Sequence, residues 1–175
     1  VYATARRVSQ WPERIGDVGV VKDLAIHDID MTRYLFNDDV VEVYAKADSL
    51  RHKKFEDHAQ ILLSFKGRKN AFIEANWLTP YKIRKLIVTG SEAIMTLDYI
   101  TQEITIENQG QTLAPRYEVK EPLKLELQHF ASSILNGKAP IVTGTDGLKA
   151  VQIAEAALES ARTGTTVKIK PPLLA

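Results

Sequence analysis

The sequence contains no cysteine, and this absence removes several kinds of chemistry at once. Disulfides, thiolate metal sites, iron–sulfur clusters and a cysteine nucleophile are all excluded. An excess of charge of one sign is also missing, since 23 Lys and Arg stand against 22 Asp and Glu, a net charge of +1. Proteins that bind nucleic acid usually carry a basic excess. We therefore expect no nucleic-acid partner.

Long apolar runs are absent as well. No stretch approaches the roughly 18 residues that a membrane span needs, and no signal peptide is visible. We expect no membrane partner and a cytoplasmic location. The 175 residues are 45% hydrophobic, as in ordinary globular domains. The chain opens on the strand-like Val1-Tyr2-Ala3-Thr4-Ala5 without an initiator methionine, so we expect a fragment of a longer chain.

Hydrophobic periodicity predicts the order of helices and strands. A strand over 1–8, a loop over 9–22 and a helix over 23–36 come first. Strand-like segments follow at 40–47, 59–65, 71–78, 82–89, 93–98, 102–107 and 112–119. Helices over 123–135 and 147–162 and a short strand over 166–169 close the chain. Many short strands with tight turns favour antiparallel pairing. The prediction is an α+β fold, a large, mostly antiparallel open sheet with helices on one face.

The segment from Gly16 to Asp30 is the most informative part of the sequence. If 23–36 is helical, Asp23 and His27 lie one turn apart on one face, which Asp30 extends. A carboxylate can hold an imidazole in one tautomer and raise its basicity. Histidine is the commonest general acid or base. The pair could therefore exchange a proton with a substrate hydroxyl or carbonyl, or it could be an ordinary contact on a helix surface.

A metal site is a weaker alternative, with Asp23 and His27 as ligands and His52 or His58 as a third. His129, among apolar neighbours in its expected helix, fits a structural role better. The basic run 51–54 could meet a phosphate but fits a solvated loop better.

Other candidate residues lie on strands and at a corner between strands. Arg6 and Arg7 could hold an anionic substrate group, or they could lie on a surface strand. Trp77, Tyr81, Lys82 and Arg84 surround a strand–loop–strand corner, where pocket wall and plain packing are equally plausible. The sequence contains no G-x-G-x-x-G, Walker or G-x-S-x-G motif.

Two groups of residues resemble a known family. Asp17-Val18-Gly19-Val20 followed by Asp23-Leu24-Ala25-Ile26-His27-Asp28-Ile29-Asp30 is similar to the second domain of the glucose–fructose oxidoreductase / inositol dehydrogenase (Gfo/Idh/MocA) family. The closing helices agree, through Leu127-Gln128-His129-Phe130, Gly137-Lys138-Ala139-Pro140, Asp146-Gly147-Leu148 and the segment 156–164. Within the family, the chain looks most like the UDP-N-acetylglucosamine 3-dehydrogenase branch.

The resemblance implies the following. Members join a Rossmann domain that binds NAD or NADP to a domain like residues 1–175, and they oxidise sugar or cyclitol hydroxyls or run the reverse reduction. His27 would be the acid/base and Asp23 would orient it. The expected substrate contacts are Arg6, Arg7, Asp30 and Tyr81.

The same resemblance sets expectations for the rest of the molecule. The Rossmann domain and its assisting E-K-P lysine are missing from these residues, so the chain alone is expected to bind no dinucleotide and to be inactive. The open sheet face would pack against another subunit in a dimer or tetramer. A non-catalytic ligand-binding or oligomerisation module of the same fold is the alternative.

Overall fold

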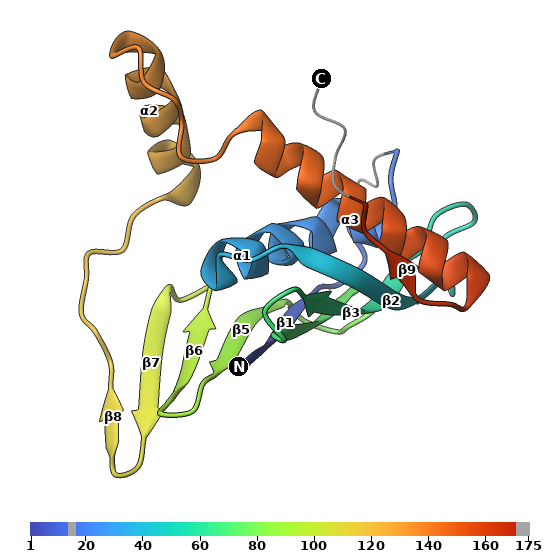
Figure 1. Cartoon of the computed structure of the whole chain (residues 1–175), viewed down its shortest axis with the longest axis horizontal. Helices are drawn as coiled ribbons and strands as arrows, with labels where there is room; N and C mark the ends of the chain where they lie inside the picture. The colour runs from blue at the N-terminus through green and yellow to red at the C-terminus, as the bar shows by residue number, and fades with distance from the viewer. Residues whose placement is uncertain (14–16, 171–175) are drawn as a thin grey trace.

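The computed structural model describes residues 1–13 and 17–170. In the described residues, nine strands form a single sheet in the order β8-β7-β6-β5-β1-β4-β3-β2-β9 (Figure 1). The strands are β1 (Tyr2–Val8), β2 (Val40–Asp48), β3 (His58–Phe65), β4 (Asn70–Asn76), β5 (Ile83–Thr89), β6 (Ile94–Asp98), β7 (Glu103–Asn108), β8 (Gln111–Leu113) and β9 (Val167–Lys168). Every pair is antiparallel except β1 with β4. The predicted mostly antiparallel open sheet is confirmed.

Two long helices cover one face of this sheet, as the sequence predicted. A π-helical turn, η1 (Val21–Ala25), runs directly into α1 (Ile26–Phe36), and α3 (Gly144–Thr163) lies beside α1 over β2 (Figure 1). The core between the helices and the sheet includes Ala5, Ile29, Ile61, Ile73, Leu86, Ile153 and Ala157. Side chains alternate along a strand, so half of them point to the other face of the sheet, which the described helices do not cover.

Strand β1 shows this alternation and decides which residues can meet the helices. Ala3, Ala5 and Arg7 are buried on the covered face, whereas Tyr2 and Arg6 are exposed on the other. Neighbouring strands add further exposed apolar side chains to that second face, including Leu62, Phe72 and Ile87. We call it the bare face below.

The structure corrects two of the predicted boundaries. We expected a loop over 9–22, but the helix already starts at Val20 and Val21, and both side chains are completely buried. The expected strand 112–119 is only the three residues of β8, with irregular chain from 114 to 121. Pro115 lies in that stretch and has no N–H to donate to a sheet ladder.

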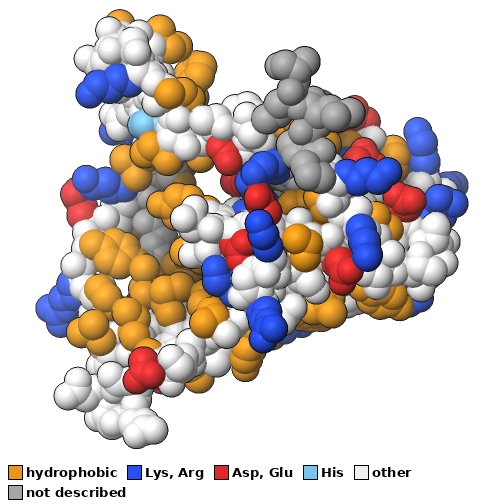
Figure 2. Space-filling model, in the orientation of Figure 1, with side chains coloured by type: hydrophobic (Ala, Val, Ile, Leu, Met, Phe, Trp, Pro, Cys, Tyr) orange, Lys and Arg blue, Asp and Glu red, His pale blue; other side chains and the backbone are white. Residues whose placement is uncertain are grey.

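Helix α2 (Pro122–Leu135) projects away from the sheet and has no extensive contact with any other described element (Figure 1). Its exposed apolar side chains include Leu123, Leu127, Phe130 and Ile134. Apolar side chains also gather over β6 and β7, as Figure 2 shows. No helix among the described residues is both long and apolar enough to cross a membrane.

Candidate active site at the start of helix α1

His27 lies in the first turn of α1, and Asp23 lies one turn earlier in η1. Both side chains are exposed, and neither ring nor carboxylate has a hydrogen bond to another described residue. The pair is close enough for the charge of Asp23 to act on His27. Turns of the π type are frequent at functional sites. Asp23 and His27 are thus both exposed one turn apart, and no hydrogen bond joins them.

A buried ion pair lies between this helix and the sheet. Arg7 of β1 donates from Nε to Asp28 Oδ2 at 2.8 Å and from Nη2 to Asp28 Oδ1 at 2.9 Å. The guanidinium carbon also lies 5.0 Å from the ring centre of Tyr99. Because the bond is bidentate and both partners are buried, it fixes helix α1 against the sheet directly beside His27.

Partial burial of the ring, together with the positive charges near it, sets the protonation of His27. Burial lowers the pKa of His27, and the charge of Arg7 lowers it further, with a smaller contribution from Arg84. The carboxylates of Asp28 and Asp23 act in the opposite direction without reversing the change. A histidine with a pKa below its usual value of about 6.5 is neutral at pH 7 and can accept a proton.

Tyr99 and Arg84 complete the surroundings of the pair. Burial raises the pKa of Tyr99 to about 12, with the charge of Asp28 adding to the effect, so its hydroxyl stays protonated. That hydroxyl is buried and has no hydrogen-bond partner in the part of the chain that the structure describes. Arg84 is directly opposite Arg7 in the ladder between β1 and β5, so both side chains lie on the covered face.

The start of the helix is held by the loop between β2 and β3. Glu56 accepts a hydrogen bond from the Val21 N–H at 3.1 Å, and its own carbonyl accepts one from the Val20 N–H at 3.0 Å. A carboxylate at this position satisfies a helix N–H that would otherwise lack a partner and suits the helix dipole. This loop therefore determines where η1 begins and where Asp23 and His27 lie.

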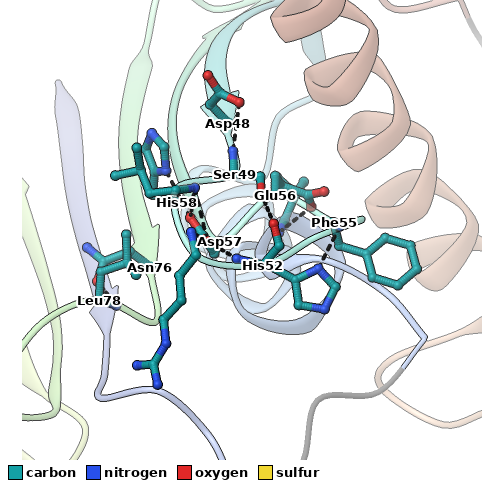
Figure 3. Close-up of polar contacts among 12 residues, drawn as sticks. Asp48, Ser49, His52, Phe55, Glu56, Asp57, His58, Asn76 and Leu78 are labelled. Carbon is teal, nitrogen blue, oxygen red and sulfur yellow. Dashed lines mark hydrogen bonds and ion pairs between the residues drawn. The ribbon is translucent and has the colours of Figure 1, made fainter.

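Asp57 in turn organises that loop (Figure 3). Its carboxylate is completely buried and accepts the N–H groups of Leu50, Arg51 and His52, and it contacts His58 Nδ1 at 3.2 Å. Burial alone would raise the pKa of Asp57, but the three backbone N–H groups and His58 outweigh it and lower the pKa to about 2. The negative charge is thus part of the folded structure.

The structure brings some predicted site residues together and separates others. His27, Asp23 and Arg7 are neighbours, but Arg7 is already occupied by Asp28. Asp30 pairs with Arg33 at 3.0 Å. Arg6 pairs with Glu74 at 2.9 Å on the bare face. Tyr81 also lies there, beside a cavity of about 530 Å³ that Arg6 lines.

Sequence reasoning missed Asp28 and Tyr99, and it left the role of Arg84 open. One signal for Asp28 was available. It falls on the inner side of the helix with Leu24, Ala25 and Ile29, where a polar residue needs a buried partner. The sequence offered no comparable signal for Tyr99, whose position depends on the pairing of β5 with β6.

Among the described residues, a metal site built on Asp23 and His27 finds no third ligand. No group of three or more His, Asp or Glu residues in the described ranges is arranged to hold a metal ion. His52 Nδ1 accepts the Phe55 N–H at 2.7 Å, and His58 contacts Asp57. His129, which we expected to be structural, accepts the Ile141 N–H at 3.0 Å.

The described helix starts do not fit the pyrophosphate of a dinucleotide, which commonly sits on a free helix N-terminus. Glu56 occupies the start of η1, and the carboxylate of Asp146 with the Thr143 hydroxyl forms a capping box at the start of α3. The start of α2 is capped by Glu121. A carboxylate at each start would repel a phosphate. Any dinucleotide would have to be held by residues other than these.

Comparison with known proteins agrees with the architecture. The model of the oxidoreductase family, C-terminal alpha/beta domain (GFO/IDH/MocA), matches residues 2–169. A scyllo-inositol 2-dehydrogenase (NAD(+)) of Bacillus subtilis (strain 168) is 32% identical over 165 residues, covering 86% of this chain and 48% of the relative. A D-apiose dehydrogenase of Rhizobium rhizogenes is 27% identical over 173 residues, covering 88% and 50%.

Solved structures show the same fold at lower identity. The UDP-N-acetylglucosamine 3-dehydrogenase GnnA from Acidithiobacillus ferrooxidans superposes with a TM-score of 0.86 at 20% identity, covering 93% of this chain and 55% of that one. A levoglucosan dehydrogenase in complex with NADH and L-sorbose gives a TM-score of 0.84 at 16% identity, covering 97% and 58%. The chain spans about half the length of the curated relatives it matches. It belongs to the GFO/IDH/MocA oxidoreductase family and corresponds to that family's C-terminal alpha/beta domain.

Proposed function

We propose that the chain is the substrate-binding part of an NAD- or NADP-dependent dehydrogenase that acts on a hydroxyl of a sugar, cyclitol or sugar nucleotide. The observation that carries the proposal is the neutral, exposed imidazole of His27 beside the Asp23 carboxylate at the start of α1. Relatives named as inositol and apiose dehydrogenases support the class of substrate.

The chain's own residues would handle the proton. His27 would accept it from the substrate hydroxyl, and the Asp23 carboxylate would hold the ring in place and stabilise the imidazolium that forms. The buried pair of Arg7 and Asp28 would keep the helix in position through the cycle. A nicotinamide cofactor would supply the hydride chemistry, and residues other than the helix starts capped by Glu56, Glu121 and Asp146 would hold it.

Replacing His27 by alanine tests the proposal in the intact enzyme. We expect kcat to fall by about 10²-fold or more, because a general base typically contributes that much. His129→Ala is the control, since it also removes an exposed imidazole but lies in α2, away from the pair. Turnover of the His27→Ala variant within a few fold of the unmodified enzyme would reject the assignment and favour a non-catalytic module.

We also propose that the bare face joins copies of this chain in a dimer or tetramer. Exposed Tyr2, Leu62 and Phe72 on adjacent strands support this, because contiguous apolar surface of this kind marks interaction sites. Since Arg6 and Tyr81 lie on this face, away from His27, we do not include them in the same substrate site.

A further inference from the structure

Two arginines lie side by side on the sheet under the start of α1. Arg7 and Arg84 are paired residues of β1 and β5, so their side chains leave the sheet on the same face and at the same level. Like charges directly opposite each other on neighbouring strands repel. Burying such charges is costly unless negative groups offset them.

The structure supplies a partner for only one of the two. Both carboxylate oxygens of Asp28 are used by Arg7. Arg84 is half-buried, and its guanidinium forms no hydrogen bond or ion pair with the described residues. The charges of Asp28 and Asp23 both act on Arg84, but neither carboxylate makes an ion pair with it. The donors of the Arg84 guanidinium are therefore available.

The surroundings of Arg84 face the candidate site. Its positive charge acts on His27, so the two side chains share one region. The carbonyl of Arg84 accepts the N–H of Tyr99 at 2.9 Å, and the buried hydroxyl of Tyr99 has no partner in the described chain. A planar guanidinium with free donors matches a carboxylate or phosphate in geometry as well as in charge.

We propose that Arg84 is an oxyanion-binding subsite of the site around His27, so the preferred substrate carries a carboxylate or a phosphate group. This inference rests on the proposed function, because it names the class of substrate for that site. It favours a sugar acid, a sugar phosphate or a sugar nucleotide over a neutral polyol of the same size.

The inference can be tested by titrating this chain with three probes while following the His27 ring signals by NMR. The probes are D-glucuronate, D-glucose 6-phosphate and neutral D-glucose. We expect at least one of the two anions to bind and to raise the pKa of His27, because a bound anion opposes the arginine charges. Glucose should bind more weakly. The anion that binds more tightly identifies the group, carboxylate or phosphate.

Two variants locate the binding. Arg84→Gln should weaken anion binding by about tenfold or more, the scale of a lost charge-assisted hydrogen bond. Lys85→Gln removes one positive charge from the next residue of β5, which points to the bare face near Asp98, and should leave the affinity unchanged. Arg84→Lys keeps the charge and should restore part of the affinity.

Equal binding of glucose and both anions, or an unchanged affinity in Arg84→Gln, would overturn the subsite. The subsite would also be overturned if Lys85→Gln lost as much anion affinity as Arg84→Gln, because binding would then depend on basic charge in general. The proposed dehydrogenase function is judged separately, by the turnover of His27→Ala. A dehydrogenase that depends on His27 but binds anions equally well without Arg84 keeps the function and loses the subsite.

Discussion

At the scale of single residues, buried charges rather than exposed ones determine how the site is held. Asp28 and Asp57 are each almost completely buried. Asp28 accepts two hydrogen bonds from Arg7, and Asp57 accepts hydrogen bonds from a set of backbone N–H groups. A buried carboxylate that lost these partners would destabilise the fold by several kcal/mol. The exposed Asp23 and His27 depend on this framework without contributing to it.

The pKa of Asp57 predicts how the protein responds to acid. It is about 2 in the folded chain against 3.8 in a free aspartate, so the ionised carboxylate stabilises the fold fully above about pH 5. We expect about 2 kcal/mol of stability to disappear as the pH falls from about 5 to about 1. Urea unfolding of the chain at a series of pH values measures this loss of stability.

The matching variant is Asp57→Asn. It should unfold about 2 kcal/mol more easily at pH 7 and show a flatter dependence on acid, because Asn lacks the charge that the backbone N–H groups stabilise. The exposed Asp17, changed to Asn, is the control and should behave like the unmodified chain. If Asp57→Asn keeps the original acid dependence, the charge of Asp57 is not its source.

At the scale of elements, the start of the helix that carries His27 is determined by a hydrogen bond to a distant loop. Glu56 caps η1 from the loop between β2 and β3. A side chain at Gly19 would meet the Glu56 carboxyl group, so Glu56 would have to move away from this cap. We expect Gly19→Ala to displace Glu56 and to lower the free energy of unfolding by about 1 kcal/mol, the usual loss for a helix cap.

A double-mutant cycle separates this effect from other effects of alanine. In a Glu56→Ala background the added methyl group meets no carboxylate, so Gly19→Ala should have little further effect. Gly147→Ala is the opposite control, because it lies within α3 with nothing near the added atom and should stabilise the chain by up to about 1 kcal/mol. Equal destabilisation by Gly19→Ala in both backgrounds would contradict the proposed clash.

Elements that follow local patterns were predictable, and those that depend on distant partners were not. Strand β3 alternates Ile61, Leu63 and Phe65, and its limits are close to the prediction. The start of η1 depends on Glu56, 35 residues away, which no local pattern reveals. The same holds for the candidate site. The pair of Asp23 and His27 was predictable because both lie one turn apart in the sequence, whereas the pair of Arg7 and Asp28 was not, because it joins two separate elements.

At the scale of the whole molecule, the bare face forms a continuous cross-strand row. Tyr44, Leu62 and Phe72 pair across β2, β3 and β4, and the row continues through Thr4 to Ile87. Helices cover only the opposite face, so nothing in the described chain shields this row. Covering it would remove apolar area from water at about 25 cal/mol per Å².

We therefore expect a measured mass above the 19.6 kDa of one chain at high concentration, by light scattering after size exclusion. Phe72→Asp should return the chain to a monomer, because it places a charge in the centre of the row. Leu127→Asp puts the same charge on the equally exposed α2 and should leave the assembly intact. Dissociation by Leu127→Asp alone would assign the assembly to α2.

The position of β1 in the sheet has a consequence for synthesis on the ribosome. This first strand lies between β4 and β5, so both of its edges find partners only after Thr89 has been made. Until then the nascent chain offers an unpaired strand to any neighbour, and unpaired edges promote aggregation. Arg6 and Arg7, adjacent on that strand, give it two positive charges that oppose such contacts between nascent chains.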